Sequence, residues 1–267
     1  SGRPGPVVLA VPEDVAHGEH AFAADEFRAD GRAAHVPSLR ARPDSDAVRE
    51  AAALLGAARR PVILAGGGVH LSGAHAELRA LAEALDAPVA HTLSGKGAIS
   101  CLDERSIGLF GRYNRYANEI IQSADALLVI GCKLGEIATK RYALPPPGVP
   151  VVHLDSSAEE LGRHTRVDVA LWGDAREGAR DLRAALASHG RPERGELWRE
   201  VADRRAAWMA DARPRYESAD RPVHMARLIG ELNAVLPPEA VVVADGGFAS
   251  HWTGLLYDTK QAGRGFI

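Results

Sequence analysis

The sequence predicts an α/β fold, built on an open parallel sheet with helices on both faces. The predicted strands are continuous apolar runs, among them "VILA", "ALLVI" and "VVHL", which is typical of strands that helices cover on both faces. These runs alternate with helical patterns, and such alternation builds a parallel sheet through right-handed crossovers. We expect this sheet domain to extend from about residue 46 to residue 188.

The elements of the predicted domain follow in chain order. The stretch "DSDAVREAAALLGAA" begins with a capping residue and continues with apolar residues three and four apart, which predicts a helix. We expect strands at residues 62–65, 88–91, 126–130, 151–154 and 169–172. We expect further helices at residues 72–85, 114–123, 175–187, 197–212 and 223–235, with a short one near 158–161.

Both ends of the chain contain a strand pattern without the neighbours that a sheet requires. A strand at 7–11, within "GRPGPVVLAVPEDV", has no preceding helix, and a strand at 240–244 leads into a glycine turn where the pattern stops. A natural edge strand and a flexible tail are one interpretation. We favour the other, in which both segments belong to neighbouring domains.

Composition excludes several classes of function. The chain has 267 residues, of which 46% are hydrophobic and 25% charged, as is ordinary for a globular protein. The net charge of −3 gives no reason to expect nucleic acid or an anionic membrane as a partner. Two cysteines do not make a disulfide framework, and no apolar run approaches the ~18 residues of a membrane span. We therefore expect a cytoplasmic protein.

Suggestive residues stand at the carboxyl ends of the predicted strands, where open parallel sheets bind ligands. They are Gly66, Gly67, Gly68, Thr92, Gly131, Asp155 and, in the weaker "WGDA", Gly173 and Asp174. Glycines let a diphosphate approach backbone amides, and Asp155 could accept the hydroxyls of a ribose. The alternative is that the glycines only form tight turns and that Asp155 caps the next helix. The sequence leaves both hypotheses open.

More specific motifs are missing. Leu71 stands where G-x-G-x-x-G requires its last glycine, and Gly97 stands where a P-loop requires serine or threonine. There is no H-E-x-x-H and no G-x-S-x-G. His153 lies inside an apolar strand and is interpreted as a core residue, and "RYNRY" as the surface start of a helix. The sequence therefore contains no self-sufficient active site.

Four segments, taken together, resemble the thiamine-diphosphate enzymes of the acetolactate synthase type. "GRPGPVVLAVPEDV" is similar to the last strand of that family's pyrimidine-binding domain. "RRPVILAGGGV" and "VVHLDSSAEELGR" are similar to strands and turns of its central domain. "VVVADGGFASHW" resembles the D-x-G turn that opens its diphosphate-binding domain, with Trp252 in the place of a family tryptophan.

The resemblance implies an organisation that accounts for both chain ends. Residues 1–15 would be the end of the pyrimidine-binding domain, and residues 222–267 the start of the diphosphate-binding domain. Between them would lie a linker at 16–45, the central nucleotide-binding-like domain at 46–188, and a linker with a helix at 189–221.

The resemblance also implies ligands for the strand ends. In synthases that bind FAD, the central domain holds it at positions that here are Gly66, Gly67, Gly68, Thr92, Leu93, Gly131, Lys133, Asp155, Gly173, Asp174 and Ala175. Lys133 replaces a family arginine and lacks its planar fork of donors, and Phe110 replaces a family histidine. FAD, an ADP-like ligand as in oxalyl-CoA decarboxylases, and an empty cleft all remain open. Gly247 and Ser250 are the candidates for contact with the thiamine diphosphate.

The implied reaction is that of a thiamine-diphosphate- and Mg²⁺-dependent carboligase or lyase acting on 2-oxo acids, in which the cofactor carries the chemistry. The family's catalytic glutamate and its metal-binding G-D-G…N segment find no match here, so we expect no catalytic or metal-binding residue in this chain and no turnover by it alone. The full-length enzyme would be a homodimer or homotetramer. The alternatives are a 2-oxo acid or oxalyl-CoA-type decarboxylase, or a non-catalytic nucleotide-binding module of the same fold.

Overall fold

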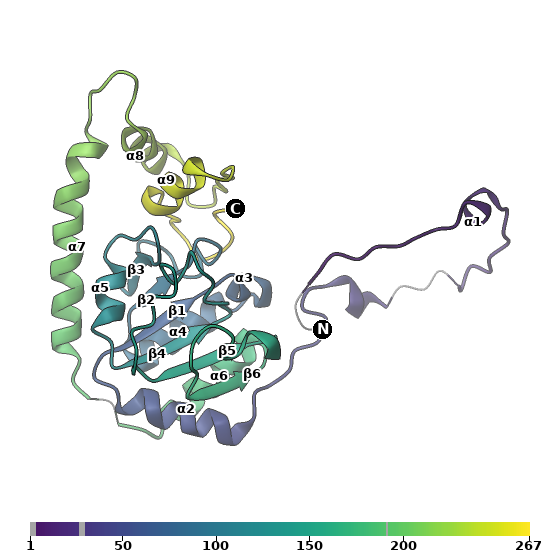
Figure 1. The fold of residues 1–267 in the computed structure, drawn as a ribbon, viewed down its shortest axis with the longest axis horizontal. Helices are drawn as coiled ribbons and strands as arrows, with labels where there is room; N and C mark the ends of the chain where they lie inside the picture. Colours follow the sequence, from purple (N-terminus) through teal and green to yellow (C-terminus); the bar gives the residue numbers. More distant parts are fainter. Residues whose placement is uncertain (1–3, 27–29, 191) are drawn as a thin grey trace.

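A computed structural model describes residues 4–26, 30–190 and 192–267. Its centre is a six-stranded sheet in the order β3-β2-β1-β4-β5-β6, and every pairing is parallel (Figure 1). The strands are β1 Pro61–Ala65, β2 Val89–His91, β3 Ser106–Leu109, β4 Ala126–Ile130, β5 Val151–Asp155 and β6 Val169–Trp172. The predicted fold class is confirmed.

Helices cover both faces of the sheet. The helices of the described residues are α1 Glu13–His17, α2 Ser45–Ala57, α3 Gly68–Ser72, α4 His75–Leu85, α5 Ala117–Gln122, α6 Ala175–Leu186, α7 Gly195–Tyr216, α8 Met225–Val235 and α9 Phe248–Leu256. Of these, α1 lies away from the sheet, and α8 and α9 pack in a separate small core (Figure 1). Ile63 of β1 packs in one core with α2, α4 and α6, whereas Val62 and Leu64 pack in a second core with α5 and α7. Successive strand residues point to opposite faces, so the all-apolar strands serve two cores at once.

Local sequence explains where the helices begin and break. The Asp44 carboxylate accepts hydrogen bonds from the amides of Asp46 and Ala47, which starts α2. The helix predicted at 72–85 begins only at His75, as α4, because Gly73 adopts a left-handed conformation with φ of 62° and ends a separate short helix, α3, at Ser72. The short helix near 158 is a 3-10 turn, Ala158–Glu160.

Two terminal strand predictions are wrong for this chain. Residues 4–12 form no strand, and Val7 and Val8 are each 91% exposed. In Figure 1 this segment extends away from the sheet, and no strand of the described residues pairs with it. At 240–244 there is a single parallel bridge, from Val242 to Phe266. Without a neighbouring strand, the backbone N–H and C=O groups of such a segment bind water instead of forming a β-ladder.

The structure also contains elements that the sequence did not predict. β3 was missed because it is short and contains Gly108 at a φ of 81°. Helix α9 was missed because the sequence was interpreted there as a turn only. It packs with α8 in a third, small core that includes Ile229, Tyr257 and Phe266.

The C-terminal segment is joined to the loops at the carboxyl edge of the sheet. The amide of Cys101 donates to the Thr259 carbonyl at 2.9 Å, and the buried Lys96 ammonium donates to the Gly254 carbonyl at 2.9 Å. Arg115 binds the Asp258 carboxylate at 2.7 Å. These contacts place α9 beside β3 (Figure 1).

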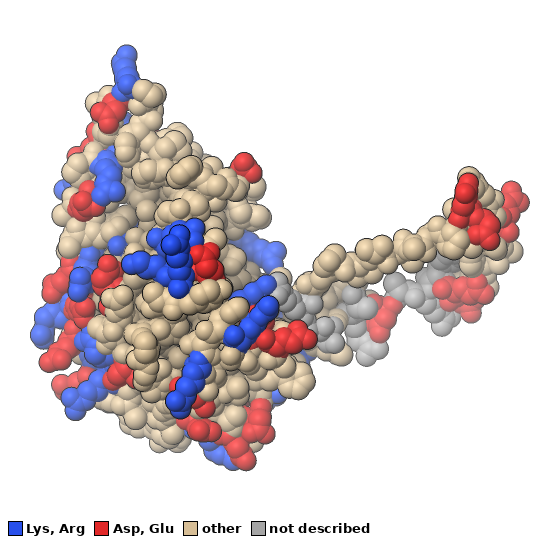
Figure 2. All heavy atoms as spheres, viewed as in Figure 1, with Lys and Arg blue, Asp and Glu red and all other residues tan. Residues whose placement is uncertain are grey.

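Acidic and basic side chains are interspersed over the main body in Figure 2, whereas the tip of the projecting N-terminal arm shows acidic side chains only. This distribution agrees with the modest net charge of −3. Over the described ranges, no helix has both the length and the apolar character needed to cross a membrane.

Candidate functional site

A cavity of about 1050 Å³ lies where the strand-end loops meet the C-terminal segment. It brings together most of the residues that the sequence singled out, namely Gly66, Gly67, Gly68, Thr92, Gly131, Lys133, Asp155 and Ser250. The C-terminal segment contributes Ala244, His251, Arg264, Phe266 and Ile267 to its lining. We call this cavity the cleft.

Turn packing explains two of the cleft's three consecutive glycines. A Cβ on Gly66 would lie 2.2 Å from the Gly131 carbonyl oxygen, and a Cβ on Gly68 would lie 2.6 Å from the Gly131 Cα. Gly131 itself has a φ of 56°. Only glycines allow the ends of β1 and β4 to approach this closely. Gly67 is half-buried, and the nearest atoms to its Cβ position belong to Ser94, at 3.3 Å and beyond.

Thr92 and Asp155 also have local structural roles. The Thr92 hydroxyl accepts a hydrogen bond from the Gly95 amide at 3.0 Å and so shapes the loop after β2. One oxygen of the half-buried Asp155 carboxylate accepts from the Ser157 amide at 2.9 Å. This bond does not cap the next helical turn, because the N-cap of Ala158–Glu160 is Ser157 and that turn has no side-chain cap hydrogen bond. The capping hypothesis for Asp155 is therefore not confirmed, and the carboxylate shapes the turn after β5 instead. Its contact with a ribose stays a prediction, because the same carboxylate also lines the cleft.

Some charged groups of the cleft form ion pairs with described residues, and others do not. Arg112 forms an ion pair with Glu136. Lys133 is exposed, and its ammonium has no hydrogen bond or ion pair with any described residue. Lys133 follows the end of β4, so the cation stands beside the glycine turn.

Two histidines form a neutral pair beside the cleft: His70 of α3, which lines it, and His75, the first residue of α4. His70 Nε2 lies 3.0 Å from the Lys96 carbonyl, which can only accept, so this nitrogen carries the proton. His70 Nδ1 therefore accepts from His75 Nε2 at 2.9 Å. Burial, with a smaller contribution from His75, lowers the pKa of His70 to about 4. Both rings act as polar, uncharged groups at neutral pH, since burial lowers the pKa of His75 as well.

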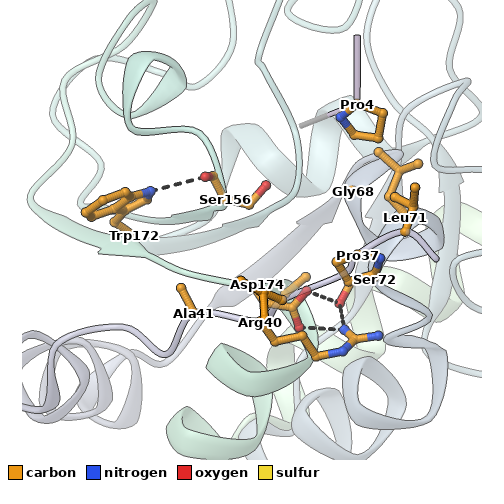
Figure 3. A pocket seen from close by; sticks show the side chains of 13 residues that line it. Pro4, Pro37, Arg40, Ala41, Gly68, Leu71, Ser72, Ser156, Trp172 and Asp174 are labelled. Atoms are coloured by element: carbon orange, nitrogen blue, oxygen red, sulfur yellow. Dashed lines mark hydrogen bonds and ion pairs between the residues drawn. The ribbon is translucent and has the colours of Figure 1, made fainter. Parts of the chain in front are cut away.

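Gly173 and Asp174 lie outside the cleft. Asp174 lines a second hollow of about 430 Å³, which shares Gly68, Leu71 and Ser156 with the cleft (Figure 3). The oxygens of Asp174 accept from Arg40 and from the Ser72 hydroxyl, each at 2.8 Å, and from the first amides of α6. A Cβ on Gly173 would lie 2.7 Å from a ring carbon of Pro43. These two residues anchor the chain before α2.

The two candidates for thiamine diphosphate contact are only partly together. Ser250 lines the cleft, and its hydroxyl donates to the Gly247 carbonyl at 3.0 Å. Gly247 is exposed at a φ of 79° and is not part of the cleft lining.

Sequence analysis missed several residues of the cleft, among them Arg112, Tyr113 and Arg264. Arg112 and Tyr113, interpreted as helix-start surface, line the cleft, and the Tyr113 ring stacks on His251 with centroids 4.0 Å apart. Arg264 lines it from the C-terminal segment. No sequence signal joins residues so far apart along the chain, because only the chain path brings them together. His153 is confirmed as a core residue, and its Nε2 lies 3.0 Å from the Cys132 carbonyl.

A match to a protein-family model over the sheet domain identifies the family of this chain. The thiamine pyrophosphate enzyme family, through its central domain, matches residues 48–182. The chain belongs to this family. The matched range contains all six strands, and the match therefore agrees with the parallel α/β fold.

Relatives of this family member are acetolactate synthases. The chain is 31% identical to a probable acetolactate synthase large subunit of Methanocaldococcus jannaschii, over 98% of this chain and 44% of the relative. It is 31% identical to an acetolactate synthase of Mycobacterium bovis, over 94% and 40%. It is 30% identical to the acetolactate synthase isozyme 1 large subunit of Escherichia coli, over 98% and 44%. The chain thus spans less than half the length of these relatives.

Proposed function

We propose that this chain is the middle part of a thiamine-diphosphate- and Mg²⁺-dependent enzyme that acts on 2-oxo acids as an acetolactate synthase does. The observation that carries the proposal is the coverage: relatives named acetolactate synthase align with 94–98% of this chain but with only 40–44% of their own length. The whole enzyme would be a cytoplasmic homodimer or homotetramer.

The proposed domain boundaries are those that the resemblance to this family implies. Residues 1–15 are assigned to the pyrimidine-binding domain, 16–45 and 189–221 to linkers, 46–188 to the central domain and 222–267 to the diphosphate-binding domain. The exposed apolar residues at 7–11 support a missing sheet neighbour. The parallel bridge from Val242 to Phe266, with α9 between them, supports the start of another parallel sheet.

The cleft is proposed to hold an adenine nucleotide, FAD or ADP. Its volume of about 1050 Å³ suffices for such a ligand. The Asp155 carboxylate at the end of β5 is assigned to the ribose hydroxyls, and Lys133 at the end of β4 to the phosphates. The second hollow, with the apolar side chains of Leu71 and Trp172, adjoins the Asp155 side and suits the adenine ring.

Thiamine diphosphate would contact this chain at the turn before α9. The amides around Gly247 can donate to a diphosphate, and so can the Ser250 hydroxyl if it rotates away from the Gly247 carbonyl. The cofactor's thiazolium would supply the carbanion that attacks a 2-oxo acid. Two such donors do not complete a cofactor site. Its other ligands, the Mg²⁺ site and the catalytic glutamate are assigned to the rest of the enzyme, and the chain alone is expected to be inactive.

One observation favours a second candidate, a 2-oxo acid or oxalyl-CoA-type decarboxylase. Lys133 and Phe110 stand where FAD-binding synthases carry arginine and histidine. In that case ADP rather than FAD would occupy the cleft.

Thermal unfolding of the purified chain with FAD, ADP and thiamine diphosphate tests the nucleotide proposal. A ligand that binds only the folded form adds about 2.7 kcal/mol at a hundredfold excess over its Kd. We expect FAD or ADP to raise Tm and Asp155→Asn, which keeps an acceptor for the Ser157 amide, to reduce the shift. No response to any of the three ligands would contradict a nucleotide cleft.

Activity assays test the proposed division of labour. The chain with thiamine diphosphate and Mg²⁺ is expected to release no CO₂ from a 2-oxo acid, whereas the enzyme completed by its flanking domains should turn over. Decarboxylation by the chain alone would contradict the assignment of the catalytic groups to those domains.

A further inference from the structure

One cation of the cleft comes from the C-terminal segment and was not assigned by sequence. Arg264 lines the cleft, and its side chain is exposed. Hydrogen bonds hold its backbone on both sides, from the Gly263 amide to the Gly97 carbonyl at 2.8 Å and from the Val242 amide to the Gly265 carbonyl at 3.0 Å. The position of Arg264 relative to the strand-end loops is therefore set by the fold.

The guanidinium of Arg264 has no partner among the residues that the structure describes. The other charges around the cleft are largely engaged: Arg112 pairs with Glu136, and Glu160 lies 3.4 Å from Arg163. The positive charge of Arg264 is felt nearby, because it contributes to the lowered pKa values of His70 and His75. The structure thus places an unneutralised arginine in a cleft that the uncharged His70 also lines.

Lys133 supplies a second unneutralised cation from a different wall. It follows β4, whereas Arg264 belongs to the segment that pairs with Val242. The carboxylate of Asp155 stands at the end of β5, the next strand of the sheet. A ligand that matches this pattern carries hydroxyl groups at one end and a compact anion at the other. A nucleoside diphosphate has this distribution.

We propose that Arg264 and Lys133 together bind the diphosphate of an adenine nucleotide, so that the C-terminal segment completes the cleft of the central domain. An arginine fork can bind two phosphate oxygens at once, and lysine binds as a point charge. This inference rests on the proposed nucleotide function of the cleft. It adds that the nucleotide bridges the sheet domain and the segment after Val242.

Calorimetric titration of ADP and of adenosine into the same chain tests the inference. Arg264→Ala should raise the Kd of ADP about tenfold or more, as expected for the loss of a charge-assisted hydrogen bond. The Kd of ADP for Arg264→Lys should lie between the values for the unaltered chain and for Arg264→Ala. Lys133→Ala should also raise the Kd of ADP. Adenosine, which has no phosphate, should bind Arg264→Ala as it binds the unaltered chain.

A matched control is Arg183→Ala, which removes the same charge from an exposed position on α6 outside the cleft. It should leave ADP binding unchanged, and the Tm of Arg264→Ala without ligand should equal that of the unaltered chain.

The possible failures are distinguishable. If the unaltered chain binds neither ADP nor FAD, the nucleotide function and this inference both fail. If ADP binds the unaltered chain and Arg264→Ala equally well, only the phosphate role of Arg264 is overturned. Equal weakening of ADP and adenosine by Arg264→Ala would also overturn it, because the effect would then be on the shape of the cleft.

Discussion

Two stretches of almost the same sequence have opposite environments in this molecule. "VVLA" at 7–10 and "VILA" at 62–65 differ at one position. Leu64 lies in β1 between two hydrogen-bonded neighbours and is 0% exposed, whereas Leu9 is 85% exposed and belongs to no strand. An apolar run therefore specifies that a segment can be a buried strand. Whether it becomes one depends on neighbours elsewhere in the chain or in another domain.

The largest expected difference between the two stretches is in stability. Leu64→Ala leaves a cavity in the core shared with α5 and α7 and should lower the free energy of unfolding by about 2–5 kcal/mol. Leu9→Ala makes the same chemical change at an exposed position and should change it by less than about 0.5 kcal/mol. Urea unfolding followed by circular dichroism measures both. Equal losses would mean that residues 7–11 are packed after all.

A smaller loss of stability is expected where Asp174 joins the N-terminal region to the sheet domain. Asp174 is 6% exposed, caps α6 and holds Arg40, so Asp174→Ala should cost about 2 kcal/mol of stability. Asp44 caps α2 at an exposed position, and Asp44→Ala should cost about 1 kcal/mol. Chemical unfolding of both variants compares them. A smaller loss at Asp174 than at Asp44 would contradict the anchoring role of the Arg40 contact.

The smallest expected effect is on the pH dependence of stability. Burial lowers the pKa of His70 to about 4 from 6.5, so between these values the unfolded chain binds more protons than the folded one. Stability should therefore fall as pH drops from about 6.5 to 4, and His70 should account for on the order of 1 kcal/mol of this loss. His70→Gln, which stays uncharged, should show a shallower decline.

The control for this prediction lies in the exposed segment. His17, whose side chain is 79% exposed, can be changed to glutamine without altering a buried group. The stability profile of His17→Gln from about pH 4 to 7 should follow that of the unaltered chain. If the profile of His70→Gln also follows that of the unaltered chain, the half-buried histidine pair does not resist protonation.

Sequence patterns predicted the sheet domain well, for a physical reason. Strands buried on both faces, such as 126–130, must be apolar throughout, and the capping carboxylates of Asp44 and Asp174 stand beside the helices they start. The break at Gly73 and the short β3 depend on single backbone conformations that periodicity does not report. The two terminal strand predictions are wrong because an apolar run does not report whether a neighbouring strand is present: none pairs with residues 7–11 in the described part of the chain, and residues 240–244 make only the bridge from Val242 to Phe266.

The cleft was predictable on one side only. Parallel strands bring their carboxyl ends to one edge, so the strand pattern alone was enough to place Thr92, Gly131 and Asp155 together. The opposite wall comes from residues after 240, and their approach depends on contacts such as Lys96 with the Gly254 carbonyl. Sequence patterns therefore could not predict that Arg264 lines the cleft. Conversely, Gly66 and Gly68 are explained by turn packing as well as by any ligand.

A crystal structure of the chain grown with ADP tests the central claim most directly. The account predicts the diphosphate beside Gly67 between Lys133 and Arg264, and the ribose hydroxyls on the Asp155 carboxylate. ADP bound elsewhere, or bound in the cleft with its phosphates turned toward Asp155, would contradict it.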